Sequence, residues 1–140
     1  MGQRGSLLPL IGGAAIFLLA IIFGAASATS LLIERQRLYS LADGAAVYAS
    51  ESFDPQNVRM SANGVLAPLT SQQVRSATLV YLSRVGSDDL EGLSLDDAST
   101  PDGRHVEVSL SSLWEPPLAS DFFPVSLRIS VTAKSQAFIQ

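Results

Sequence analysis

The chain has 140 residues, with 9 basic and 13 acidic side chains, a formal net charge of −4 and no cysteine. The acidic balance argues against nucleic acid as a partner, because phosphate binding requires a basic surface. The lack of cysteine excludes disulfides, thiolate chemistry and cysteine–zinc sites, so the fold must be stable without covalent cross-links.

An uncharged segment covers residues 7–33. It is longer than the roughly 20 residues that cross the ~30 Å hydrocarbon core of a bilayer, so we predict a transmembrane helix there, preceded by a cytoplasmic head of residues 1–6. Basic residues lie on both sides of the segment, but the long acidic remainder indicates a C-terminus outside the cytoplasm. Small residues at which other membrane helices could pack closely are Gly24, Ala25 and Ala28.

A second interpretation is secretion. Ala26, Ser27 and Ala28 fit the small-x-small pattern of a signal-peptidase site, and cleavage between Ala28 and Thr29 would release a small binding domain. The apolar run before that site is about 20 residues long, whereas the apolar region of a signal peptide has about 7–15. The helical pattern also continues through the site, so the uncut anchor is the favoured interpretation.

The helix is predicted to continue as an amphipathic extension over residues 34–53. Apolar side chains recur there at helical spacing, namely Leu38, Leu41, Ala42, Ala45, Ala46 and Ala49. This stripe is either the core face of an outer domain or a surface on which neighbouring subunits pack. Gly44 lowers helix stability by roughly 1 kcal/mol relative to alanine. Asp54 and Pro55 should end a helix of about 45 residues, near 70 Å in length.

Residues 54–140 are predicted to form a small extracytoplasmic domain. Residues 57–68 have the composition of a loop. Apolar spacing, a capping box of Thr70 and Gln73, and Gly86 predict a second helix over residues 71–85. Alternating side chains predict strands over residues 106–110 and 125–133, and Leu93 and Leu95 a further short strand.

The alternation buries one face of each strand, which indicates an antiparallel sheet covered on a single side. The amphipathic part of the first helix is the expected cover. The predicted fold class is therefore α+β: a long N-terminal helix, transmembrane and then amphipathic, packed on a small antiparallel sheet with a second short helix.

Residues 87–103 are acidic and rich in turn-forming residues. Asp96, Asp97 and Asp102 are the candidates for a calcium site, because hard cations bind clustered carboxylates. Their spacing does not match an EF-hand loop, so we expect a solvated loop without a metal. Aromatic side chains between the last two strands, Trp114, Phe122 and Phe123, either cap the core or form a contact surface.

Catalytic motifs are not evident in the sequence. His105 is the only histidine, and no serine lies in a G-x-S-x-G motif. Nothing in the acidic segment suggests a dry pocket that would separate the pKa values of two carboxyl groups. We therefore predict that the protein is not an enzyme and has no cofactor and no small-molecule substrate.

The first third of the chain resembles a known family. Residues 4–10, RGSLLPL, and the apolar run after them resemble the N-terminus of TadE/TadG-like proteins of the bacterial Tad (Flp) pilus-assembly system. RQRLY at residues 35–39 and LADGAA at residues 41–46 resemble the stretch that follows the membrane segment in that family.

The resemblance implies a single-pass protein of the bacterial cytoplasmic membrane that acts as a pilin-like or minor pilin component. Its partners would be other pilin or assembly subunits, contacted through helix packing. A prepilin peptidase would cut between Gly5 and Ser6, but the fifth residue after that cut is Leu10 and not glutamate. Intact anchoring is therefore expected in place of release as a bulk subunit.

Overall fold

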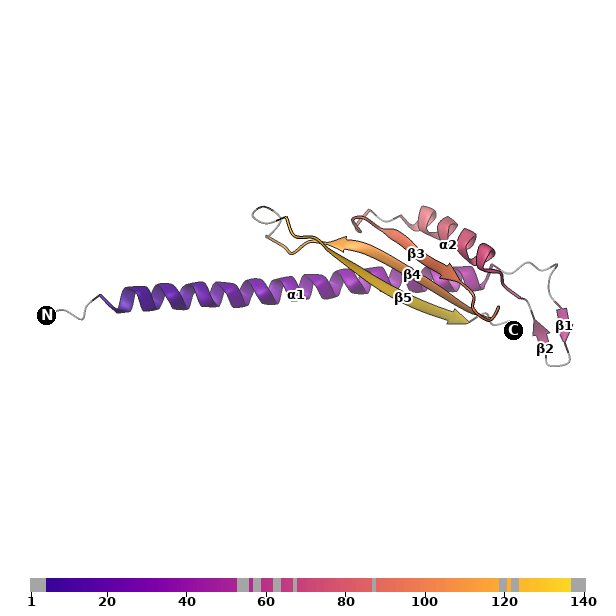
Figure 1. The fold of residues 1–140 in the computed structure, drawn as a ribbon, viewed down its shortest axis with the longest axis horizontal. Coiled ribbons are helices and arrows are strands. Elements are labelled where there is room, and N and C mark those ends of the chain that lie inside the picture. Colours follow the sequence, from indigo (N-terminus) through magenta and orange to yellow (C-terminus); the bar gives the residue numbers. More distant parts are fainter. Residues whose placement is uncertain are drawn as a thin grey trace.

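The computed structural model describes residues 5–52, 56, 59–61, 64–66, 68–86, 88–118, 121 and 124–136. The chain is an α+β protein, as the sequence predicts, with one long helix, one short helix and a three-stranded antiparallel sheet (Figure 1). The elements in chain order are α1 (Leu7–Ser50), β1 (Arg59–Ser61), β2 (Gly64–Leu66), α2 (Ser71–Val85), β3 (Ser94–Ser99), β4 (His105–Trp114) and β5 (Leu127–Gln136).

Helix α1 is a single unbroken helix of 44 residues. It ends at Ser50, three residues before the predicted limit at residue 53, and Asp54 and Pro55 lie outside the described residues. Two serine hydroxyls close the last turn: Ser50 Oγ donates to the Val47 carbonyl at 2.7 Å and Ser52 Oγ to the Ala49 carbonyl at 2.7 Å. The same two carbonyl groups also accept the backbone N–H groups of Glu51 and Ser52, so side-chain and backbone hydrogen bonds together close the last turn.

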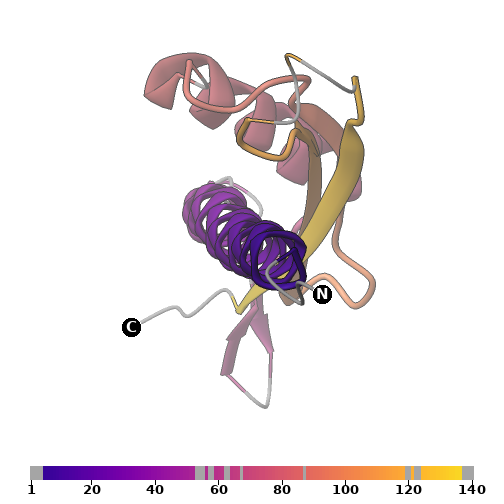
Figure 2. The same cartoon turned by 90° about the vertical axis from the view of Figure 1, so that its left-hand side faces the viewer.

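The sheet has the strand order β3-β4-β5, with neighbouring strands antiparallel. Pairing of β4 with β5 runs from His105 opposite Gln136 to Trp114 opposite Leu127. The alternate side chains of β4, Val106, Val108 and Leu110, are fully buried, as predicted. Figure 2 shows both helices on the same side of the sheet, so only one of its faces is covered.

A small hairpin lies within residues 57–68, where the sequence predicts a loop. Strands β1 and β2 pair antiparallel over three residues each, with Ser61 opposite Gly64. Gly64, the first residue of β2, belongs to a turn-forming Asn-Gly pair of the kind that favours a hairpin, although Asn63 lies outside the described residues. The composition of this segment indicated the turn but not the pairing on either side of it.

Helix α2 has the predicted bounds. The Thr70 side-chain oxygen accepts a hydrogen bond from the backbone N–H of Gln73. The Gln73 side-chain oxygen accepts one from the backbone N–H of Thr70, which completes the capping box. Gly86 follows with a positive φ of 76°. Both ends of this helix are therefore determined by local residues.

The core lies between the sheet and the second half of α1. Fully buried side chains from α1 meet buried side chains of β4 and β5, with Leu69 and Val74 closing the side next to α2. Five α1 residues of the predicted stripe are completely buried, namely Leu38, Ala42, Ala45, Ala46 and Ala49. The small domain therefore packs on the second half of α1 and leaves the first half exposed. We call this exposed part, residues 7–26, the bare half.

Candidate functional site

The bare half of α1 is the most distinctive surface of the described chain. Every described residue from Gly5 to Ala26 is exposed, including bulky side chains such as Phe17 and Leu18. The helix is long and apolar enough to cross a membrane, and its place near the N-terminus also fits a signal sequence. From Leu7 to Ala26 the helix extends about 30 Å, which matches the hydrocarbon thickness of a bilayer.

The residues predicted for helix packing separate into two groups. Leu38, Ala42, Ala45, Ala46 and Ala49 are buried within the chain and Leu41 packs partly against the same core, so this stripe is the core face of the domain. It is not available to a neighbouring subunit in this fold. Gly24 and Ala25 are exposed on the bare half, and Ala28 is exposed just beyond it, so a partner helix could reach all three.

Trp114 joins the end of the sheet to α1. Its side chain is only 7% exposed, and its indole Nε1 donates a hydrogen bond to Ser30 Oγ at 3.3 Å. Trp114 was predicted in a connecting loop, but it is the last residue of β4. Because it is buried, it is not an exposed contact residue; it closes the end of the core. Phe122 and Phe123 lie outside the described residues.

The contact with Ser30 places the domain beside residues that the sequence assigns to the membrane segment. Ser27, Ser30 and Leu31 are half-buried, whereas residues 5–26 are exposed. The predicted span of residues 7–33 therefore overlaps the α+β domain by about two turns. The part of α1 that is free of the domain ends near Ala26.

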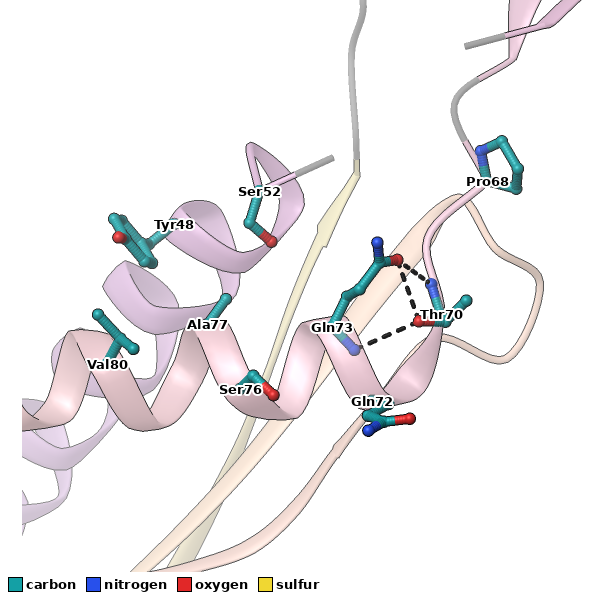
Figure 3. A pocket seen from close by; sticks show the side chains of 9 residues that line it. All are labelled: Tyr48, Ser52, Pro68, Thr70, Gln72, Gln73, Ser76, Ala77 and Val80. Carbon is teal, nitrogen blue, oxygen red and sulfur yellow. Dashed lines mark hydrogen bonds between the residues drawn. The ribbon is translucent and has the colours of Figure 1, made fainter. Parts of the chain in front are cut away.

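A groove lies between the end of α1 and the first turns of α2 (Figure 3). Its volume is about 780 Å³, and its described lining residues are Tyr48, Ser52, Pro68, Thr70, Gln72, Gln73, Ser76, Ala77 and Val80. Thr70 and Gln73 are engaged with each other in the capping box, as the dashed lines in Figure 3 show. The described lining contains no carboxylate, histidine or basic side chain, so it offers no acid–base pair for catalysis.

The predicted calcium candidates do not converge. Asp96 and Asp97 lie in strand β3 and not in a loop; Asp96 Oδ1 accepts from Ser111 Oγ at 2.9 Å, and Asp97 Oδ2 accepts from Ser99 Oγ at 2.9 Å. The register of β3 against β4 shifts between Leu95 and Asp97, which indicates a bulge at Asp96. Within the described ranges, no three His, Asp or Glu side chains gather in a way that could hold a metal ion.

A polar link that the sequence did not reveal crosses all three strands. Arg128 Nη1 on β5 donates to Ser111 Oγ on β4 at 2.9 Å, and Ser111 Oγ donates to Asp96 Oδ1 on β3. The link brings an arginine and a carboxylate together through one buried hydroxyl. The strand register makes Asp96 and Arg128 diagonal neighbours of Ser111, since the residues directly opposite Ser111 are Ser94 and Ser130. No sequence spacing could have predicted the link.

Asp102 and His105 form an exposed turn before β4. Asp102 Oδ1 accepts from the backbone N–H groups of His105 at 2.7 Å and Arg104 at 2.9 Å, and Asp102 Oδ2 contacts the His105 Nδ1 atom. The backbone N–H of His105, then its side chain and the Arg104 N–H, hold the pKa of Asp102 well below its usual range. The pair is exposed and closes a turn, which gives it a structural role.

No family model, no curated protein and no solved structure matches this chain. The chain is an α+β domain that packs on the second half of a long helix and leaves the apolar first half exposed.

Proposed function

We propose that this protein is a membrane-anchored, pilin-like component of a Tad/Flp-type pilus, which acts by helix packing and assembly and not by catalysis. One observation carries the proposal: α1 continues without a break from a fully exposed apolar half into the core of the outer domain. A rigid helix of this kind can hold a small domain at a fixed position relative to the membrane. The resemblance of residues 4–50 to TadE/TadG-like proteins supplies the pilus context.

In this proposal, lipid holds residues 7–26, and the remainder of α1 couples that anchor to the sheet. The C-terminal domain lies outside the bacterial cytoplasmic membrane. Exposed apolar side chains cost free energy in water, at roughly 25 cal/mol per Å² of surface, so the bare half requires lipid or a partner helix around it. Neither role needs an active site, and the described lining of the groove beside α2 contains no carboxylate, histidine or basic side chain.

Subunit contacts are proposed at two exposed small residues of α1, one on the bare half and one two residues beyond it. Gly24 and Ala28 are one turn apart on the same face of α1 and allow close approach of a second helix. The test replaces each with leucine in the full-length protein and measures how much pilin or assembly subunit copurifies from detergent-solubilised membranes. We expect a loss of about tenfold in copurified subunits, the equivalent of roughly 1.4 kcal/mol.

A matched control is available on the opposite face. Ala15 lies nine residues before Gly24, which is half a turn away around the helix at 3.6 residues per turn. Ala15→Leu makes a similar change in size and should leave copurification unchanged. Equal behaviour of Gly24→Leu, Ala28→Leu and the unmodified protein would refute packing at this face.

A second candidate function is a secreted binding domain released by cleavage after Ala28. The observation in its favour is that the hydrogen bond of Trp114 reaches Ser30, two residues after the site, so the cut would keep this contact. Mass spectrometry of the mature protein decides between the two. A mature N-terminus at Thr29 would establish secretion, and an intact N-terminus would support the anchor.

A further inference from the structure

The connection between β4 and β5 lies at the end of the domain that faces the bare half of α1. In Figure 1 the end of β4 and the start of β5, which flank this connection, are the parts of the sheet nearest the N-terminal end of the helix. The hydrogen bond from Trp114 to Ser30 fixes its level along α1. Ser30 is four residues beyond Ala26, or about 6 Å along the helix. A membrane around residues 7–26 would therefore have its surface close to this connection.

Bulky apolar side chains are exposed at this end of the domain. Leu118 is 72% exposed, Val125 49% and Leu127 50%. On α1, at the same level, Leu32 and Ile33 are also exposed. We call these five residues the seating surface. Such a patch is unfavourable in water but suits the boundary between lipid headgroups and acyl chains.

Leu118 supplies a second observation. It has a positive φ of 69° and is the only non-glycine residue with a positive φ in the described part of the chain. A leucine in this left-handed region costs free energy, because its Cβ atom lies too close to the following carbonyl oxygen. The backbone is therefore held in an unfavourable conformation at the residue that presents the most exposed apolar side chain of the seating surface.

We propose that the seating surface inserts into the headgroup–acyl boundary of the membrane from which α1 emerges. This inference depends on the proposed membrane anchor and adds a second contact, so the domain lies against the lipid and does not stand away from it. The headgroup layer adds about 5–7 Å on each side of the hydrocarbon core, so the 6 Å offset between Ala26 and Ser30 places Ser30 within that layer.

Charge indicates which lipid is suitable. Glu115 and Asp121 are exposed in the same connection, and Arg35 and Arg37 are exposed within the next two turns of α1. Mixed charge of this kind gives no net attraction to anionic lipid. We therefore assign a zwitterionic headgroup, such as phosphatidylethanolamine or phosphatidylcholine, as the partner. The two arginine side chains can extend to its phosphate groups.

Site-directed spin labelling tests the proposal, because a chain without cysteine accepts a single label at any chosen position. The full-length protein is reconstituted at low density into phosphatidylcholine vesicles as Leu118→Cys, Leu79→Cys or Leu18→Cys. Collisions of the label with oxygen, which concentrates in lipid, are compared with collisions with a water-soluble nickel chelate. Leu79 is a matched control, since it is 51% exposed on α2. Leu79 is two residues before Tyr81, the residue through which α2 packs against Gly44 of α1. Gly44 lies about 21 Å beyond Ser30 along α1, so a label at position 79 is far from the proposed membrane surface.

We expect the oxygen-to-nickel collision ratio at position 118 to be several-fold higher than at position 79, and highest at position 18. A ratio at position 118 equal to that at position 79, with position 18 in lipid, would overturn the seating surface and leave the anchor intact. Water-like ratios at all three positions would refute the anchor and the inference together. A label at position 118 shielded from both reagents would indicate a protein partner and also overturn the proposal.

A second measurement uses Trp114, the only tryptophan of the chain. Bromine atoms placed near the ester carbonyls of the lipid should quench its fluorescence more strongly than bromine atoms near the bilayer centre. Leu118→Gly should weaken this shallow quenching several-fold, because glycine keeps the left-handed backbone but removes the apolar side chain. No quenching from either depth would contradict the proposal.

Discussion

Gly44 lies where α2 packs against α1, and the phenol of Tyr81 occupies the space that a side chain would fill. A Cβ atom added at this position would contact Tyr81 Oη and lie 3.0 Å from Tyr81 Cζ. The Tyr81 ring also packs against Tyr48, with ring centroids 5.6 Å apart. The glycine that the sequence marks as a weakness of the helix therefore allows the two helices to approach.

Gly44→Ala should destabilise the domain by about 1–2 kcal/mol, because the cost of overpacking exceeds the gain of roughly 1 kcal/mol in helix propensity. The measurement is thermal unfolding in detergent, followed by the near-ultraviolet signal of Trp114. In a Tyr81→Leu background the same substitution should become neutral or stabilising, which completes a double-mutant cycle. A higher melting temperature for Gly44→Ala alone would contradict the contact.

Asp102 should make stability depend on acid pH. Its pKa in the folded protein is lowered from the usual 3.8, chiefly by the backbone N–H of His105. The stabilisation is therefore present above about pH 4, where the unfolded chain would also be ionised, and is lost as pH falls toward the lowered pKa. Asp102→Asn keeps an acceptor for the turn but removes the charge.

The expected result is that unfolding free energy falls more steeply below pH 4 for the natural protein than for Asp102→Asn. Denaturant unfolding at several pH values between 5 and 2 measures both slopes. Parallel slopes would show that Asp102 does not contribute to acid sensitivity.

Helix α2 is the element whose limits depend most on its own sequence. Thr70 and Gln73 exchange hydrogen bonds at its start, and Gly86 accepts a positive φ at its end. These interactions involve residues three or four positions apart, so they form wherever the segment is helical. The first end of α2 should therefore depend measurably on one side chain.

Thr70→Ala removes the hydroxyl oxygen that accepts a hydrogen bond from the backbone N–H of Gln73, and it should lower the free energy of unfolding by about 1 kcal/mol. Gln72→Ala is the matched control, because Gln72 is exposed in the same turn and lies outside the capping box. Amide hydrogen exchange in the first turn of α2 should accelerate in Thr70→Ala only. Equal exchange in both variants would contradict the role of the cap.

At the scale of the whole molecule, α1 has two environments along one continuous helix. Its second half is covered by both α2 and the sheet on one side, and its first half is exposed on every side (Figures 1 and 2). The division falls near Ser27 and Ser30, where the domain begins. A solvent-exposed half of this composition is expected to partition into lipid.

Leu18→Arg places a charge in the middle of the bare half and should reduce membrane insertion by about 3 kcal/mol, roughly a hundredfold. The measurement is the fraction of full-length protein that remains in alkali-washed membranes. Leu79→Arg makes the same change on exposed α2 and should have no effect. Retention of both variants in the membrane would argue against the helix as the anchor.

Several features of the fold could be predicted from the sequence because their causes are local. The uncharged run indicated one long helix, the capping box and Gly86 gave both ends of α2, and alternation identified the buried face of β4. The start of β5 was predicted two residues too early. Val125 continues the alternation of side chains, but the strand begins at Leu127, opposite Trp114. Backbone pairing with β4 ends at Leu127, and the alternation of side chains gives no information about backbone pairing.

The tertiary structure decided what each half of α1 can contact. The function of the bare half and its location in a membrane stay predictions. The sequence by itself determined that α1 is long, apolar at first and amphipathic afterwards, because periodicity and charge are properties of neighbouring residues. It could not decide whether Leu38 and Ala49 face the core or another subunit, nor that Trp114 reaches Ser30 across 84 positions. Those outcomes depend on how the sheet is placed on the helix, and that placement is set by packing between segments far apart in the chain.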